Sequence, residues 1–141
     1  MRQTHFTHQL VEFIPEHLEE GILYVSRRYK TAVHKCACGC GVEVVTPLSP
    51  TDWGIQIENS KVTIEPSIGN WSFPCRSHYF VRRWRVVWAE QISRRDVERS
   101  RAQDMKARER YIKETNRQKV LSSHNLLYEV WLSLKRWWMS L

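Results

Sequence analysis

Three cysteines that alternate with small residues are the feature that most constrains how this chain folds. They form the run Cys36-Ala-Cys38-Gly-Cys40-Gly, and the fourth cysteine, Cys75, lies far along the chain. The flanking glycines let the backbone curl tightly beside the thiols. Only one of the three clustered cysteines could pair with Cys75, so a disulfide would leave two thiols unexplained. The pattern therefore favours a metal site.

A structural zinc site needs four soft or borderline donors, and paired donors on tight turns are the usual solution. Cys75 and His78, three residues apart, form a second pair. The spacing leaves the choice among the first three cysteines open. The preferred set is Cys38, Cys40, Cys75 and His78, with Cys36 as the substitute for Cys38 and His34 as a lesser candidate. The full set of candidate zinc ligands is Cys36, Cys38, Cys40, Cys75 and His78. Because donors are in excess, a closed structural site is favoured over a catalytic one.

Composition is that of a folded protein that does not span a membrane. Hydrophobic residues make up 42% of the 141 residues, too many for a disordered chain. No apolar run is long enough for a transmembrane helix. The first residues, MRQTHFTHQLVEF, lack the apolar core of a signal peptide. These features predict a cytoplasmic protein, in which thiols stay reduced.

Glycine and proline divide the chain into a β-rich part and a helical part. All prolines and glycines precede residue 76. Short strands are expected at 9–15, 21–26, 31–36 and 42–48, and hairpins over 53–66 and 78–89. Helices are expected from Ser93, a plausible N-cap, to about Lys119, and from about Asn125 onward. The predicted fold is α+β: a small antiparallel zinc-binding β domain over 1–90, a basic helix over 91–119, and a linker with a Trp-rich terminal helix over 120–141.

The terminal helix is apolar on all but a narrow stripe. Its polar residues recur at helical spacing, and nearly all the rest are apolar. The favoured interpretation is a core helix that covers the sheet. The alternative is a helix that docks to a partner or a membrane boundary through Trp131, Trp137 and Trp138.

The net charge of +7 is concentrated in residues 82–119. Arginines from this segment could neutralise nucleic-acid phosphates. The candidates are Arg82, Arg83, Arg85, Arg94, Arg95 and Arg99, followed by Arg101. Acidic residues interleave the later part of the segment, so a solvated helix face is the commoner explanation. Nucleic-acid binding is therefore a minor hypothesis.

Catalysis is a further hypothesis. Ser67, His78 and Asp52 could assemble a Ser/His/Asp set for nucleophilic catalysis. Alternatively, an open metal site could activate water with Glu43 or Glu65 as the base. The simpler interpretation makes Ser67 and Asp52 turn residues and His78 a zinc ligand. No established hydrolase motif is present.

Several boxes together resemble a bacterial family of unknown function. They are H-K-C-A-C-G-C-G, E-P-S-I-G-N-W, C-R-S-H-Y and the W-A-E-Q-I-S-R-R helix start, within about residues 20–115. Some members of that family are encoded beside ubiquitin-like conjugation genes. The resemblance implies a metal-binding β domain that uses the same four cysteines and His78. More weakly, it implies a role in modifier processing or transfer.

Together these observations favour a zinc-stabilised binding or accessory module in a bacterial ubiquitin-like pathway. Its expected partner is a ubiquitin-like protein or one of its conjugation enzymes. The first alternative is a hydrolase or peptidase that processes such a protein. The second alternative is a nucleic-acid-binding protein that uses the basic helix.

Overall fold

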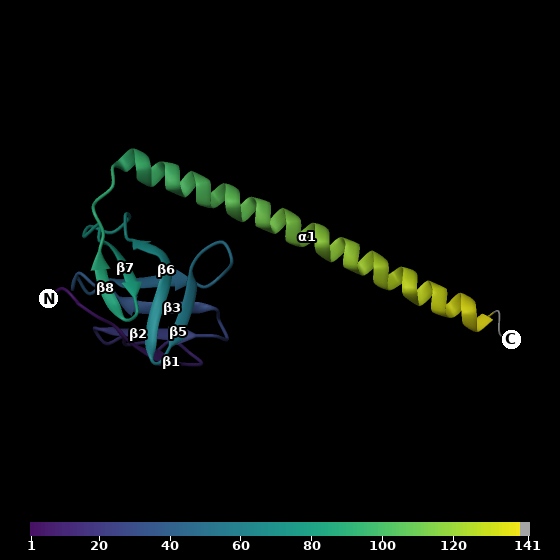
Figure 1. Cartoon of the computed structure of the whole chain (residues 1–141), viewed down its shortest axis with the longest axis horizontal. Coiled ribbons are helices and arrows are strands. Elements are labelled where there is room, and N and C mark those ends of the chain that lie inside the picture. Colours follow the sequence, from purple (N-terminus) through teal and green to yellow (C-terminus); the bar gives the residue numbers. More distant parts are fainter. Residues whose placement is uncertain (139–141) are drawn as a thin grey trace. The chain divides into compact units, whose positions relative to one another are not determined.

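The computed structural model describes residues 1–138, apart from the side chains of His124, Leu126, Leu127 and Trp137. It divides into two compact units, Met1–Ser100 and Arg101–Leu141. The first unit contains two four-stranded sheets, most of whose strands are labelled in Figure 1. The predicted α+β fold, a strand-rich part followed by a C-terminal helix, is confirmed.

The first sheet has the strand order β1-β2-β3-β4. Its strands are β1 (Thr7–Leu10), β2 (Ile22–Ser26), β3 (Thr31–Lys35) and β4 (Glu43–Pro47). β1 pairs with β2 in parallel, and the other pairs are antiparallel. The first strand lies slightly earlier than the stretch 9–15 that alternation predicted. The cysteine run occupies the connection between β3 and β4.

The second sheet is an antiparallel meander with the order β5-β6-β7-β8. Its strands are β5 (Gly54–Glu58), β6 (Lys61–Gly69), β7 (His78–Arg82) and β8 (Arg85–Trp88). Both predicted hairpins are present. Asn59 and Ser60 turn between β5 and β6 with φ angles of 48° and 62°, as two-residue hairpins of the primed type require.

One hydrophobic core contains residues of both sheets. Leu23 and Val25 come from β2, whereas Ile64 and Val81 come from β6 and β7, and all four are buried. On β6 and β7 the buried residues alternate with more exposed ones, as expected when one face of a sheet is buried. Tyr79, also fully buried, lies in the same cluster. The opposite face of β7, which carries His78, Phe80 and Arg82, is more exposed. β2 is buried on both faces, since Tyr24 belongs to a second buried cluster with Leu18 and Val33.

A bulge interrupts the pairing of β6 with β7. Ile64 pairs with Val81 and Ile68 pairs with Tyr79, so β6 has two more residues than β7 between these pairs. The extra length falls around Pro66, which has no N–H to contribute to a ladder. Bulges re-aim side chains and are common beside functional sites. Here the bulge sets the position of Ser67.

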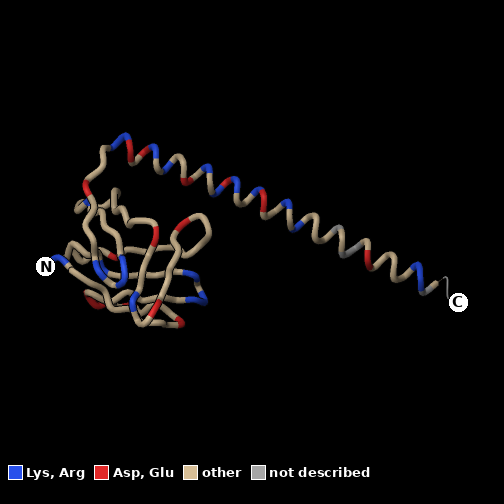
Figure 2. The backbone as a smooth tube through the Cα atoms, viewed as in Figure 1, with Lys and Arg blue, Asp and Glu red and all other residues tan. Residues whose placement is uncertain are grey.

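The C-terminal segment is one helix, α1 (Arg94–Trp138), and not the two helices that the sequence predicted. The polar stretch 116–124 continues the helix because it contains neither glycine nor proline. Ser93 is the N-cap, as predicted: the Asp96 backbone N–H donates to its Oγ at 3.2 Å. Figure 2 shows charged residues of both signs along the first half of α1 and few beyond it.

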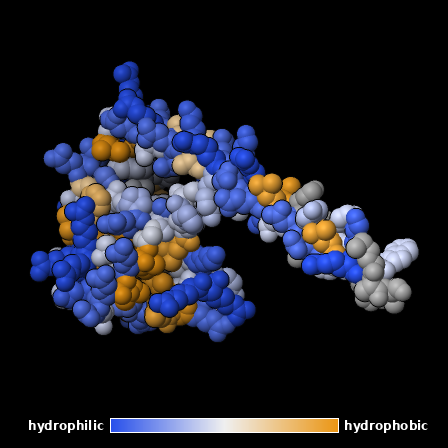
Figure 3. All heavy atoms as spheres, turned by 45° about the vertical axis from the view of Figure 1, so that its right-hand side comes forward, coloured by the Kyte–Doolittle hydropathy of each residue, from blue (hydrophilic) through white to orange (hydrophobic). Residues whose placement is uncertain are grey.

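Apolar side chains on the second half of α1 are exposed. They include Val120, Tyr128, Val130, Trp131, Leu134 and Trp138. Figure 3 shows hydrophobic patches on this part of the helix. Among the described side chains of 120–138, none belongs to either hydrophobic cluster. The expectation that this segment is a core helix covering the sheet stays a prediction. No helix within the described residues is long and apolar enough to cross a membrane.

Candidate metal centre and the neighbouring serine–histidine pair

The four cysteine sulfurs meet at one point of the β unit. Sγ atoms of Cys36, Cys38, Cys40 and Cys75 all lie within 4.8 Å of one another. The Cys36 sulfur is 3.4 Å from that of Cys38 and 3.9 Å from that of Cys75. Sulfurs at the corners of a tetrahedron around Zn²⁺, each about 2.3 Å from the ion, would be about 3.8 Å apart. The four thiols are therefore close enough together to hold a metal ion.

Local backbone geometry curls the first three cysteines inward. The Gly39 N–H donates to the Cys36 carbonyl at 3.0 Å, and the Cys36 N–H donates to the Val42 carbonyl at 2.8 Å. Gly39 has a φ of 81°, and a Cβ at this position would lie 2.5 Å from the Met1 carbonyl oxygen. Only glycine satisfies both conditions, because it has no side chain. The glycines thus have the turn-forming role that the sequence predicted.

Two buried polar side chains support the sulfurs. Asn70 Nδ2 donates to Ser77 Oγ at 2.8 Å and to Cys36 Sγ at 3.5 Å. Ser77 Oγ also lies 3.0 Å from Cys36 Sγ. Partners of this kind orient the first ligands of a metal. Asn70 was missed at the sequence level, although it lies in the E-P-S-I-G-N-W box.

The thiols differ in acidity. Burial raises the pKa of both Cys36 and Cys38. Burial also raises the pKa of Cys75, but hydrogen bonds from the Ser77 backbone and side chain and from neighbouring thiols outweigh it and lower that pKa to about 7. Metal ligation requires thiolates, and a bound cation would favour all four.

The structure departs from the preferred ligand set at His78. Its ring nitrogens contact other groups: Nε2 is 3.0 Å from Ser67 Oγ, and Nδ1 is 2.9 Å from the Glu90 carbonyl oxygen. Cys36, the predicted substitute, joins the other three cysteines instead. The physical reason is the number of donors. Four converging thiols would fill the four positions around a tetrahedral ion, which leaves no position for an imidazole.

His34 is also directed elsewhere. It is completely buried, and its Nε2 lies 2.8 Å from the Tyr79 hydroxyl. Burial lowers the pKa of His34 to about 3, so the ring is neutral. Its ring packs edge-on against Phe6, with centroids 4.8 Å apart. His34 is therefore a core residue in this structure.

The contacts of His78 define its tautomer. The Glu90 carbonyl oxygen can only accept a hydrogen bond, so Nδ1 carries the proton of the neutral ring. Nε2 is then an acceptor, and the Ser67 hydroxyl donates to it. This is the arrangement by which a histidine activates a serine nucleophile.

Two tryptophans hold the serine and the histidine. Trp53 Nε1 donates to the Ser67 carbonyl at 3.3 Å, and the Trp71 ring packs on His78 with centroids 4.8 Å apart. A Cβ at Gly69 would lie 2.3 Å from Trp71 Nε1, so glycine is needed for that ring to approach. The pair is thus positioned by packing as well as by strand pairing.

A pocket of about 460 Å³ borders Pro66, the residue before Ser67. It is lined by Ser49, Pro50, Asp52, Gly54, Glu65, Pro66, Phe80 and Arg82. Asp52, the predicted acidic partner of His78, accepts a hydrogen bond from Ser49 Oγ. The oxygen on His78 Nδ1 comes from the Glu90 backbone instead. Glu65, considered as a base, lines the pocket, whereas Glu43 is an exposed residue of β4.

The candidate arginines fall into two groups. Arg82, Arg83 and Arg85 lie at the hairpin between β7 and β8. Arg94, Arg95 and Arg99 lie in the first turns of α1. Arg99 pairs there with Asp96 at 3.1 Å, which agrees with a solvated helix face.

Comparison with known proteins identifies a family but no individual relative. No curated protein and no solved structure matches the chain. A family model described as "Bacterial ubiquitination-like system serine protease (BubE)" matches residues 10–89, which include all four cysteines, Ser67 and His78. This agrees with the resemblance to a bacterial family linked to ubiquitin-like conjugation. Because the match covers more than half of the sequence, the chain belongs to the BubE family of bacterial ubiquitination-like systems.

Proposed function

We propose that this chain is a serine hydrolase that cleaves a peptide or isopeptide bond in a bacterial ubiquitination-like system. The observation that carries the proposal is the 3.0 Å contact between Ser67 Oγ and His78 Nε2, with Nδ1 on the Glu90 carbonyl. The family description supports the same chemistry. The sequence alone predicts hydrolysis only as an alternative, since it favours His78 as a zinc ligand.

In the proposed reaction, Ser67 Oγ attacks the carbonyl carbon of the scissile bond while His78 Nε2 takes the hydroxyl proton. Nε2 then protonates the leaving nitrogen as the C–N bond breaks, which leaves an ester on Ser67. Water, activated by the same nitrogen, hydrolyses the ester and restores the Ser67 proton. The Glu90 carbonyl keeps the ring in the correct tautomer throughout.

A carbonyl in place of a carboxylate has a predictable cost. It orients the imidazole, but it has no full negative charge to stabilise the imidazolium that forms during attack. We therefore expect slower turnover than from a complete triad. The same observation favours a second candidate, a binding module of the same system without turnover.

We also propose that Cys36, Cys38, Cys40 and Cys75 bind one structural Zn²⁺. The support is the convergence of their four sulfurs within 4.8 Å of one another, a group that includes no further donor among the described residues. A site closed by four thiolates supplies rigidity and has no open position for water. Since Cys75 precedes His78 by three residues, the metal would fix the start of β7 and thereby the histidine.

Labelling with a fluorophosphonate probe, which reacts only with activated serines, tests the hydrolase proposal. We expect labelling of the native protein, none of Ser67→Ala and little of His78→Gln. Ser122→Ala, at an exposed position of α1, is the matched control and should label fully. Equal labelling of Ser67→Ala and the native protein would refute the role of Ser67. No labelling of a folded, zinc-loaded protein would favour the binding module.

A further inference from the structure

A row of side chains on the outer face of β7 connects the serine–histidine pair to a cationic hairpin. His78, Phe80 and Arg82 alternate with buried Tyr79 and Val81, so the first three share the outer face. The His78 and Phe80 rings are 6.1 Å apart, and the Arg82 guanidinium lies 4.3 Å from the Phe80 ring centroid. The row is therefore continuous.

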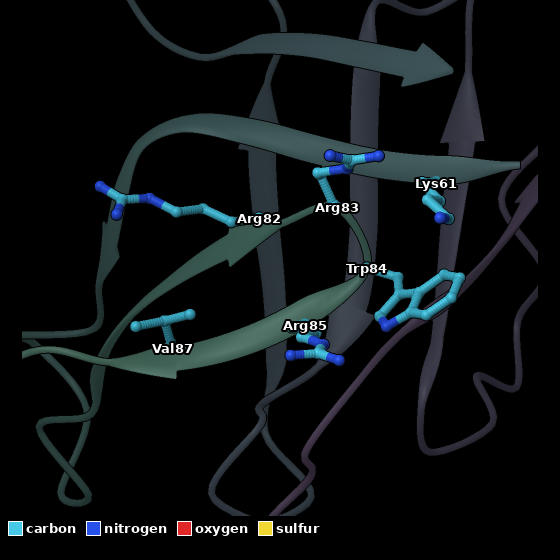
Figure 4. Close-up of a pocket in the computed structure, with 6 residues that line it drawn as sticks. All are labelled: Lys61, Arg82, Arg83, Trp84, Arg85 and Val87. Atoms are coloured by element: carbon cyan, nitrogen blue, oxygen red, sulfur yellow. The ribbon is translucent and has the colours of Figure 1, made fainter. Parts of the chain in front are cut away.

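Cationic side chains gather at the far end of this row. A pocket of about 470 Å³ there is lined by Lys61, Arg82, Arg83, Trp84, Arg85 and Val87, with no acidic residue (Figure 4). Within residues 1–138, no ion pair involves any of these four cations. Arg82 lines both this pocket and the one beside Pro66.

The tip of the hairpin is held in an unfavourable conformation. Arg83 and Trp84 have φ angles of 47° and 73°, which large residues adopt only at a cost. Hydrogen bonds fix the strained tip: the Trp84 N–H donates to the Val62 carbonyl at 2.6 Å, and the Trp84 carbonyl accepts from the Phe6 N–H at 2.7 Å. Lys61 Nζ also lies 4.9 Å from the Trp84 ring centroid.

Glycine or asparagine would form this turn with less strain. This turn instead presents an arginine and a tryptophan, and both side chains line the cationic pocket. Four cations without acidic partners fit an anionic ligand. An adjoining aromatic and aliphatic surface, Phe80 with its cross-strand partner Val87, fits an apolar side chain of the same ligand.

We propose that this outer face of β7 and β8 binds the substrate as an extended segment with an acidic side chain at the cationic hairpin. The proposal rests on the hydrolase function proposed above and adds the substrate class. From His78 to Arg82 the strand advances by about 13 Å, at roughly 3.3 Å per residue. An extended peptide covers the same length in about four residues, so the acidic residue lies about four positions from the bond that Ser67 attacks.

Quenched fluorogenic peptides that differ only in Asp or Lys at the fourth position from the scissile bond test this selectivity. We expect kcat/KM to be about tenfold higher for the Asp peptides at low salt, because two or more exposed ion pairs would form. Arg82→Glu and Arg85→Glu should abolish or reverse the preference. Arg27→Glu, the same charge change at an exposed turn of the first sheet, should preserve it. Equal cleavage of both peptides would overturn the proposal.

Binding to the Ser67→Ala protein provides a readout without turnover. A fluorescein-labelled hexaglutamate should bind with salt-sensitive anisotropy, and Arg85→Glu should weaken it about fivefold or more. If Ser67 is labelled by the fluorophosphonate but the protein shows no preference for acidic peptides in binding or cleavage, the acid-binding surface is overturned and the hydrolase function stands. Hexaglutamate binding without labelling overturns the hydrolase function and keeps the acid-binding surface. Tighter binding of a twelve-residue oligothymidylate, lost in the same variants, would overturn the peptide assignment in favour of nucleic acid.

Discussion

The thiol cluster and the serine–histidine pair are linked by the short segment from Cys75 to His78 but are held in different ways. The cluster is supported by buried Asn70 and Ser77 and contains four mutually adjacent donors. The pair depends on single hydrogen bonds and on tryptophan packing beside an open pocket. Under the functions proposed above, the metal-binding cluster is a clamp that holds the fold together and the pair is the reactive centre. The first should control stability, and the second should control activity.

Metal removal should have the largest effect, and that effect should be on the stability of the β unit. If zinc holds the cysteine loop to Cys75, a strong chelator should unfold the β unit, because structural zinc contributes on the order of 10 kcal/mol of binding energy coupled to folding. Thermal unfolding with and without chelator, alongside elemental analysis, measures the effect. A metal-free protein that stays folded with the same melting temperature would show that no metal stabilises the β unit.

Asn70→Ala should weaken the clamp without breaking it. The substitution leaves Ser77 and Cys36 without their buried donor, which should cost about 1–3 kcal/mol. Zinc affinity should fall by roughly tenfold to 100-fold, as for other partners of metal ligands. Urea unfolding and competition with a zinc chelator measure the two effects. Asn125→Ala, at an exposed site of α1, should change neither.

Gly69→Ala should disturb the packing of Trp71 on His78 while leaving the thiol cluster intact. Its new Cβ would collide with Trp71, so the ring must leave His78, at a cost of about 1–3 kcal/mol. Fluorophosphonate labelling should slow while zinc content stays stoichiometric. Gly54→Ala is the stability control, since the nearest atom to its Cβ would be 3.9 Å away. Unchanged labelling of the Gly69 variant would show that Trp71 does not position His78.

Trp53→Phe should produce the smallest effect. It removes one hydrogen bond to the Ser67 carbonyl and keeps most of the aromatic surface, so stability should fall by only about 0.5–1.5 kcal/mol. We expect a several-fold loss of labelling rate with zinc content unchanged. Trp138→Phe, on the exposed surface of α1, should leave the rate unaltered. If the two variants behave alike, Trp53 does not hold the nucleophile.

Local sequence signals predicted much of the fold. The turn at Asn59-Ser60 and the N-cap at Ser93 depend on neighbouring residues, and both are present. The merger of two expected helices into one was missed. The polar stretch 116–124 resembles a loop in composition, but it contains nothing that breaks a helix. The division of the chain into three parts at residues 90 and 119 stays a prediction.

The candidate site was only partly predictable. The thiol cluster depends on local sequence around the glycines, whereas the Ser67–His78 pair depends on how two strands pair. Thiols flanked by glycines predict a cluster, and Cys75 joins it as expected. The contact of His78 with Ser67 depends on the bulge of β6 against β7, which strand pairing decides. Asn70 gave no signal of its own, since an asparagine after glycine is typical of turns.

By itself, the sequence determined the strand-rich first part, the helical second part and a thiol cluster that joins Cys75 to the glycine-flanked cysteines, because these follow from local conformational preference and donor chemistry. Tertiary structure decided which group His78 serves and how the outer face of β7 joins the serine to the cationic hairpin. Those relations depend on strand register and on a two-residue excess in β6. A single imidazole has the chemistry for either zinc or serine, and only its position in the folded sheet selects between them.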